Sequence, residues 1–185
     1  NNAGVSAHAN FEDVPADKLA WYEQLMRVNL WGSIYCTHAA MPHLKQTQGR
    51  IVALSSLAGL VGIPGRTAYC ASKFAMTGFF EALRIELKDS GVSVTVAYPG
   101  VVDTQIRRRG LNAMGETAGE SGLREDHAMT TQECARLIIY AMVRRKREVV
   151  MTFKGKWGRW VKLLAPNLVD QMALAAVKAN FRPRA

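Results

Sequence analysis

Apolar residues recur at helical spacing in three long stretches of the chain, at about 17–45, 67–88 and 130–146. A period of three to four residues is typical of amphipathic helices with one buried face. Within the first stretch, Asn29 and Gly32 interrupt good helix formers, which predicts a local bend. The second stretch is bounded by Thr67, a good N-cap, and by Gly91, a good stop just after it.

Short continuous apolar runs lie between these helices, at 51–54, 92–97 and 149–152. They lack the in–out alternation of a half-exposed strand, so they indicate strands buried on both faces of a parallel sheet. Long helices alternating with such strands predict an α/β fold: a doubly wound, Rossmann-type parallel sheet with helices on both faces. About three strands are visible, whereas the dinucleotide-binding form of this sheet has two halves, so the chain resembles one half.

Positive charge is concentrated at the C-terminus. The net charge is +9, yet residues 1–143 hold 13 basic and 13 acidic residues, and residues 144–185 hold 11 basic residues against two acidic ones. A basic segment suits nucleic acid or an anionic membrane surface, whereas a neutral body argues against a nucleic-acid-binding core. We assign residues 1–152 to part of a single domain and residues 153–185 to a basic amphipathic tail.

Signals for disulfides, metal sites and membrane spans are weak. The three cysteines are scattered with no C-x-x-C pair, and the four histidines are also scattered, so we expect a reducing compartment and no metal. The sequence has no apolar run of 18 residues and no secretory leader pattern, which favours a cytoplasmic protein, with membrane association through the tail left open. The opening Asn1-Asn2-Ala3-Gly4 resembles the middle of a longer chain.

Tyr69 and Lys73 stand four residues apart in the second helical stretch, and this spacing places both side chains on one helix face. A free tyrosine has a pKa near 10, too high for efficient proton transfer at neutral pH. A neighbouring lysine ammonium favours the phenolate and so makes the pair a tuned acid/base. Taken alone the pattern is weak, because surface pairs produce it by chance.

Polar residues also follow two of the expected strands. Ser56 comes just past the strand at 51–54, and Pro99-Gly100 follows the strand at 92–97, with Thr104 four residues further on. Ligands of open α/β sheets bind at the carboxyl ends of the strands. A serine there can donate a hydrogen bond to a carbonyl oxygen, although an ordinary turn would also explain these residues.

Together these motifs resemble the C-terminal two-thirds of a short-chain dehydrogenase/reductase, in the branch that includes hydroxysteroid and retinol dehydrogenases. Five motifs follow the family's order and spacing: Asn1-Asn2-Ala3-Gly4, Val28-Asn29-Leu30-Trp31-Gly32, Ser55-Ser56-Leu57-Ala58-Gly59, Tyr69-Cys70-Ala71-Ser72-Lys73, and Pro99-Gly100-Val101-Val102-Asp103-Thr104. The resemblance covers about residues 1–150. It implies hydride transfer between NAD or NADP, with NADP slightly favoured, and an alcohol or carbonyl.

The resemblance also implies a role for each matching residue. Tyr69 would be the acid/base, Lys73 would tune it and bond the nicotinamide ribose, and Ser56 would polarise the substrate carbonyl. Asn29 would bind a water that links Lys73 to solvent. The remaining residues would contact the cofactor. Its adenosine half would lie by Asn2, Ala3 and Gly4, and its nicotinamide would be contacted by Pro99, Gly100, Val102 and Thr104.

One departure from the family pattern is an absence. The family begins with a strand, a Gly-rich turn and a helix that holds the pyrophosphate, and none of these precedes Asn1. We therefore expect a truncated sequence, inactive by itself, in which the N-terminal strands and the selector of NAD against NADP are missing. Residues 105–128 match the family's substrate lid, and the resemblance implies a homodimer or homotetramer for the complete protein.

Alternatives to this hypothesis remain open. A 3-oxoacyl-carrier-protein reductase shares the same motifs, and the basic tail would suit an acidic carrier protein. A non-catalytic binding protein on the same fold is a second alternative, because fold alone does not fix function. Nucleic-acid binding through the tail is a third, although the chain contains no known nucleic-acid motif.

The tail itself shows an apolar stripe. Trp157, Trp160, Val161 and Leu164 follow helical spacing among lysines and arginines, and the pattern resumes after Pro166. Such a stripe suits a helix lying in a membrane interface, where it would also receive a lipophilic substrate. It also suits a helix that packs on the domain or on a neighbouring subunit.

Overall fold

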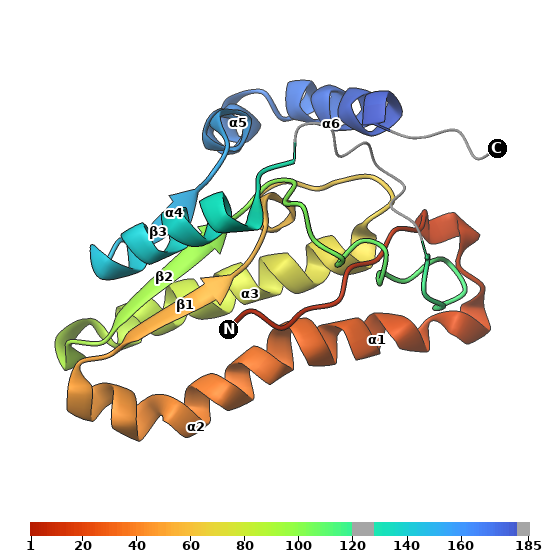
Figure 1. Cartoon of the computed structure of the whole chain (residues 1–185). Helices are drawn as coiled ribbons and strands as arrows, with labels where there is room; N and C mark the ends of the chain where they lie inside the picture. Colours follow the sequence, from red (N-terminus) through yellow and green to blue (C-terminus); the bar gives the residue numbers. More distant parts are fainter. Residues whose placement is uncertain (120–127, 181–185) are drawn as a thin grey trace.

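The computed structural model describes residues 1–119 and 128–180, and it confirms the predicted α/β architecture. Three parallel strands form a sheet that carries helices on both faces (Figure 1). The strands are β1 (Arg50–Leu54), β2 (Ser93–Tyr98) and β3 (Glu148–Val150), in the order β1-β2-β3. Each lies within two residues of its predicted position.

The first helical stretch is continuous but changes character at the predicted interruption. Helix α1 (Ala20–Met26) leads into a π-helical segment, Arg27–Trp31, and then into α2 (Gly32–Thr47). Asn29 is the buried residue of the π-helical segment. Single π-helical turns inside α-helices occur frequently at functional sites, and this one turns the Asn29 side chain into the protein interior.

Helix α3 (Thr67–Glu86) follows the loop after β1 and carries the Tyr-x-x-x-Lys motif. The expected N-cap at Thr67 is wrong: the helix is preceded by Arg66, and no side chain caps it. The Thr67 hydroxyl is instead hydrogen-bonded to the Tyr22 hydroxyl at 2.8 Å. A contact from another helix thus takes the oxygen that sequence reasoning assigned to the cap.

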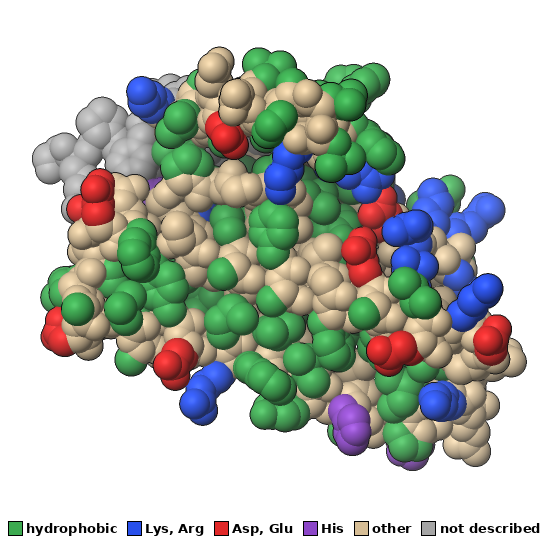
Figure 2. Space-filling view, turned by 180° about the vertical axis from the view of Figure 1, so that it is seen from behind, with side chains coloured by type: hydrophobic (Ala, Val, Ile, Leu, Met, Phe, Trp, Pro, Cys, Tyr) green, Lys and Arg blue, Asp and Glu red, His purple; other side chains and the backbone are tan. Residues whose placement is uncertain are grey.

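The C-terminal part adds three helices. Helix α4 (Thr131–Val143) is capped by the Thr130 hydroxyl, and after β3 the chain continues as α5 (Phe153–Leu164) and α6 (Pro166–Asn180). These last two helices lie along one edge of the molecule in Figure 1, and hydrophobic side chains gather over them along the top of Figure 2. None of the described helices combines the length and hydrophobicity that crossing a bilayer requires.

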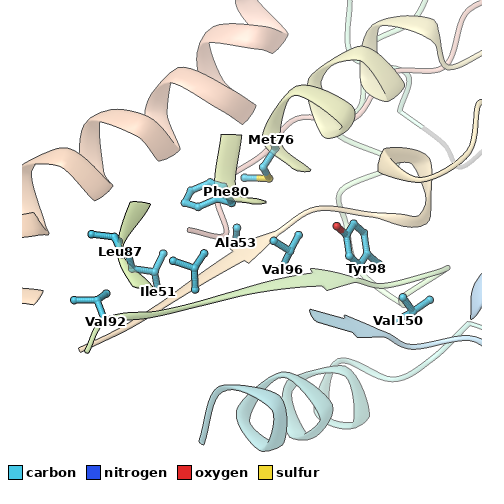
Figure 3. Packing of buried hydrophobic residues seen from close by; sticks show 10 residues of the cluster. Ile51, Ala53, Met76, Phe80, Leu87, Val92, Val96, Tyr98 and Val150 are labelled. Carbon is cyan, nitrogen blue, oxygen red and sulfur yellow. The ribbon is translucent and has the colours of Figure 1, made fainter. Parts of the chain in front are cut away.

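The main core lies between the sheet and α3. Met76 and Phe80 of α3 are fully buried, and they point onto Ala53 of β1 and Val96 of β2 (Figure 3). Helix α4 covers the opposite face of the sheet, where it contacts all three strands. Burial on both faces explains why the strands are continuous apolar runs, and it fixes α3 against the strand ends where polar residues gather.

The N-terminal segment runs beside β1 on the edge away from β2. The Asn1 ammonium donates to Val52 O at 2.8 Å, and Leu54 N donates to Asn1 O at 3.0 Å. These bonds place the first residues as a continuation of the sheet. The following residues, Val5 to Ala9, then pass beside α3 to Gly65 and Arg66, just ahead of the helix.

Candidate active site

The polar residues that follow β1 and β2 meet at one edge of the sheet. Leu57 N donates to Pro99 O at 3.1 Å, which joins the loop after β1 to the loop after β2. A Cβ added at Gly100 would lie 2.7 Å from Thr152 Cγ2, so a side chain there would collide with the residue that caps α5. The two carboxyl ends therefore form one continuous surface, as the fold class requires of a ligand site.

Tyr69 and Lys73 line this edge from α3. Their side chains are 7% and 4% exposed, so the pair is buried rather than a surface pair. Lys73 Nζ donates to Leu54 O at 2.7 Å and lies 5.7 Å from the centre of the Tyr69 ring. The last carbonyl of β1 thus holds the ammonium beside the phenol.

Burial changes the titration of this ammonium. Burial, the larger cause, and the positive charge of Arg66 together lower the pKa of Lys73 from 10.5 to about 8. Desolvation and a like charge both disfavour the protonated form. Lys73 therefore exchanges its proton nearer to neutral pH than an exposed lysine does.

The two serines after β1 have different environments. Ser55 is buried, and its hydroxyl bonds Lys73 O and Thr77 Oγ1, both at 3.1 Å, so it fastens the strand end to α3. Ser56 is half-buried, and its Oγ accepts from Ala58 N at 3.2 Å. Accepting that bond leaves the Ser56 O–H available to donate, whereas the Ser55 hydroxyl is engaged with α3.

Asn29 is fully buried and ties the N-terminal segment to α3. Its amide nitrogen donates to Val5 O at 3.0 Å and to Ser72 Oγ at 2.9 Å, and its oxygen accepts from Val5 N at 2.7 Å. A Cβ added at Gly4 would lie 3.2 Å from Asn29 Oδ1 and 3.8 Å from Lys73 Nζ. The Asn29 amide therefore holds the Gly4 backbone close to the ammonium.

The structure thus brings Asn29, Ser56, Tyr69 and Lys73 to one edge of the sheet. Of the other candidate residues, Asn2 and Ala3 lie in the N-terminal segment, and Pro99, Gly100, Val102 and Thr104 lie in the loop after β2. Among the described residues, none of them is hydrogen-bonded to this group. Of the expected lid at 105–128, residues 120–127 lie outside the described residues. Val102 pairs with Met129, which fixes the base of that segment.

The residues present fit the ribose and nicotinamide end of a dinucleotide. An ammonium has three N–H bonds, and Leu54 O takes one of those of Lys73, while Met76 Sδ lies 3.9 Å away. At Gly4 and Gly100 the backbone packs closely against Asn29 and Thr152, and Ser56 can donate at the same edge. We find no group of three or more His, Cys, Asp or Glu able to hold a metal within the described residues.

Sequence reasoning missed Arg66, which lies on the Tyr69 ring. It also missed the Asn29–Val5 bonds, which join residues 24 positions apart. The spacing of Arg66 and Tyr69, three residues apart at the start of a helix, is the signal that could have identified the first contact. No local sequence pattern predicts the Asn29–Val5 hydrogen bonds.

A parallel sheet with helices on both faces and polar residues gathered at the carboxyl ends of its strands defines an α/β domain of the Rossmann type. The family model for short chain dehydrogenase matches residues 1–115, and the chain belongs to that family.

Similar proteins carry dehydrogenase names. The chain is 35% identical over 172 residues to 11-beta-hydroxysteroid dehydrogenase-like 4A of Arabidopsis thaliana, covering 91% of this chain and 54% of the relative. It is 34% identical over 170 residues to dehydrogenase/reductase SDR family member 7B of Rattus norvegicus, covering 91% and 51%. The chain therefore spans about half the length of these curated relatives.

Solved structures share the fold. A short chain dehydrogenase from Burkholderia cenocepacia in complex with NADP superposes with a TM-score of 0.77 at 23% identity, covering 94% of this chain and 67% of that one. A short-chain dehydrogenase from Streptomyces avermitilis gives 0.72 at 20% identity, covering 95% and 68%.

Proposed function

We propose that the protein carrying this chain is an NAD(P)-dependent oxidoreductase that acts on an alcohol or carbonyl substrate. The observation that carries the proposal is the position of Lys73, bonded to Leu54 O and buried beside the Tyr69 ring at the carboxyl edge of the sheet. Family membership and the dehydrogenase names of the relatives support it.

The proposed chemistry divides between cofactor and chain. The bound nicotinamide supplies or accepts the hydride. In the reducing direction, the phenol of Tyr69 gives its proton to the substrate oxygen: the phenolic O–H bond breaks, and the alcohol O–H bond forms. Lys73 favours the resulting phenolate, and Ser56 donates a hydrogen bond to the same substrate oxygen. In the oxidising direction the proton travels back to the phenolate.

The proposed cofactor contacts follow the family pattern. Lys73 would bond the nicotinamide ribose, and Asn29 would hold a water that connects Lys73 with solvent. The proposed contacts on either side of this centre are Asn2, Ala3 and Gly4 toward the adenosine half, and Pro99, Gly100, Val102 and Thr104 toward the nicotinamide. The NADP complex of the Burkholderia structure supports a nicotinamide cofactor, and we keep both NAD and NADP as candidates.

The proposed substrate is a lipophilic alcohol or ketone, in keeping with the hydroxysteroid dehydrogenase names of several relatives. The whole protein should be assayed with both cofactors against steroid and retinoid alcohols, their ketones, and a 3-oxoacyl thioester. Preference for the thioester would favour the carrier-protein reductase. Failure to turn over any of them would favour a non-catalytic binding protein.

The neighbouring serines provide a matched pair for this assay. Ser56→Ala should lower kcat about 100-fold, because one donor to the developing oxyanion is lost. Ser55→Ala should instead cost about 1–2 kcal/mol of stability, because its buried bonds to α3 are lost. Equal losses of activity in both variants would contradict the role of Ser56.

We also propose that the complete protein assembles as a homodimer or homotetramer through its two long helices. Trp31, Tyr35 and Ile85 are 46%, 65% and 65% exposed on these helices, and the centres of the Trp31 and Tyr35 rings lie 5.8 Å apart, so the helices present large apolar side chains to solvent. A Tyr35→Glu variant should shift the mass measured by light scattering toward the monomer. An unchanged mass would exclude this face as the interface.

A peripheral membrane contact through α5 is the second proposed property, because this helix turns its aromatic side outward. Phe153, Trp157 and Trp160 are 76%, 59% and 57% exposed. Its inward side is basic: Arg159 pairs with Glu148, and Lys162 donates to Leu60 O at 3.2 Å. Of the stripe, Trp157, Trp160 and Leu164 are exposed and Val161 is half-buried, which supports an outward-facing apolar surface.

Exposed lysines flank this aromatic surface. Lys154 and Lys156 are exposed on the first turn of α5, and each cation near an anionic surface contributes about 1 kcal/mol. Vesicle co-sedimentation tests the proposal: binding to anionic vesicles that weakens with salt and with deletion of 153–185 supports it. Negligible binding to anionic and neutral vesicles alike leaves a neighbouring subunit as the occupant.

A further inference from the structure

Arg66 lies directly on the ring of the proposed acid/base. It is the last residue before α3, three positions ahead of Tyr69, and its Cζ is 4.3 Å from the centre of the Tyr69 ring. The preceding Gly65 has a φ of +71°, a left-handed conformation that glycine adopts without strain. This turn starts the helix with the Arg66 side chain folded over the phenol.

The guanidinium is fixed from the opposite side by the N-terminal segment. Its Nη2 donates to Ser6 Oγ at 2.5 Å and its Nε to Ala7 O at 3.4 Å. Ser6 and Ala7 are buried, and Ala9 N donates to Gly65 O at 2.8 Å, so three hydrogen bonds join the two segments. The planar guanidinium of Arg66 is therefore held in one orientation by hydrogen bonds and is not free to rotate in solvent.

Two cations thus flank one phenol. The centre of the Tyr69 ring is 4.3 Å from Arg66 Cζ and 5.7 Å from Lys73 Nζ. Burial lowers the pKa of Arg66, and the nearby Tyr69 hydroxyl opposes that change. The charged and titratable groups around this phenol are Arg66, Lys73, the Cys70 thiol next to it, Arg107 from the loop after β2, and His8 beside Gly65.

A cation over an aromatic face is attracted by the ring's electrons, and more strongly when the ring carries a negative charge. Arg66 therefore interacts better with the phenolate than with the phenol. It also holds the ring in one plane, because a guanidinium and an aromatic ring stack face to face. Both effects act on the atom that would exchange a proton with substrate.

We propose that Arg66 is a positioning residue for Tyr69, which orients its ring and favours its phenolate alongside Lys73. This inference rests on the proposed function, since it concerns the acid/base of that reaction. Arg66 acts through its contact with the Tyr69 ring, while the hydrogen bond to Ser6 holds the guanidinium in place. This role needs no contact with substrate or cofactor.

The test uses the whole protein with its tyrosines labelled at the ring carbon that bears the hydroxyl, in which Tyr69→Phe identifies the Tyr69 signal. Arg66→Gln should move the pH at which the Tyr69 signal titrates up by about one unit. Arg66→Lys keeps the positive charge, so the Tyr69 signal of this variant should titrate close to the pH found for the unaltered protein. Arg84→Gln removes the same charge from the far end of α3, about 22 Å away, and should move nothing.

Kinetics give the second readout. The acid limb of the kcat/KM profile for alcohol oxidation should move with the Tyr69 titration, and kcat should fall about tenfold at neutral pH in Arg66→Gln. An unmoved titration in an Arg66→Gln protein that is merely less stable overturns the proposal. If the unaltered protein has no NAD(P)-dependent turnover, the proposed function fails, and the titration alone still decides the role of Arg66.

Discussion

The strand-end site and the outer face of α5 differ in what surrounds their side chains. At the site, polar groups are buried, and the chain itself supplies their partners, as Asn29 and Lys73 illustrate. On α5, large apolar groups such as Trp157 and Leu164 are exposed, without cover from the part of the chain that the structure describes. In the first region buried polar groups are hydrogen-bonded within the protein, whereas in the second large apolar side chains face solvent.

The largest effects on stability should come from the buried core and not from exposed groups of similar size. Phe80→Ala should lower the free energy of unfolding by about 3–5 kcal/mol, because the fully buried ring leaves a cavity. Trp160→Ala should change it by less than about 0.5 kcal/mol, because the ring is exposed. Chemical denaturation of both variants checks the contrast; comparable losses would show that the outer face of α5 is packed.

Asn29 offers the next test, because three hydrogen bonds of a fully buried amide depend on it. Asn29→Ala should cost about 2–4 kcal/mol, since Val5 and Ser72 lose their partner inside the protein. Asn167→Ala, on the exposed side of α6, is the control and should be nearly neutral. Comparing the melting temperatures of the two variants distinguishes the loss of the Asn29 hydrogen bonds from a general effect of removing an amide side chain.

The pH dependence of stability should report the buried ammonium. In the cofactor-free protein the pKa of Lys73 is lowered to about 8, whereas the unfolded chain has the ordinary value of 10.5. The unfolded state therefore binds more protons between these two values, so this group makes the protein more stable as pH rises through the window.

A Lys73→Met variant isolates this contribution. The unfolding free energy of the unaltered protein minus that of the variant should increase by up to about 1.4 kcal/mol per pH unit between pH 8 and 10.5. It should be flat below pH 8, where lysine is protonated in both states. Subtraction cancels the opposite trend of Tyr98, whose pKa burial raises to about 12. A flat difference throughout would mean that Lys73 keeps an ordinary pKa.

The smallest effect is expected from the lysines of α5. Lys156→Gln should reduce binding to anionic vesicles by about fivefold, because one cation near the surface contributes about 1 kcal/mol. Stability should not change, since the side chain is exposed. Equal binding of the variant and the unaltered protein at low salt would remove the electrostatic part of the membrane proposal.

Periodicity predicted the fold well because the information is local. Continuous apolar runs gave β1 to β3 within two residues, and the interruption at Asn29 is a π-helical segment. The cap at Thr67 was wrong because a hydroxyl from another helix engages its side chain. Local rules cannot anticipate a partner 45 residues away in the sequence.

The candidate site was predictable as a set of residues but not as a network. The motifs placed Ser56, Tyr69 and Lys73 near one sheet edge, and the structure puts them there. The links that fix them are non-local: Lys73 to Leu54 O, and Asn29 to Val5. Arg66 escaped notice because arginine before a helix is most often solvated, and only the turn at Gly65 folds it onto the ring.

The central claim is that Tyr69 exchanges a proton with the substrate. Its most direct test is the NAD(P)-dependent turnover of the whole protein carrying Tyr69→Phe, beside Tyr140→Phe, in which an exposed hydroxyl of α4 is removed. The first variant should lose about 1,000-fold or more in kcat while its circular dichroism and melting temperature are retained, and the second should stay within twofold. A Tyr69→Phe protein that turns over at near the unaltered rate would contradict the account.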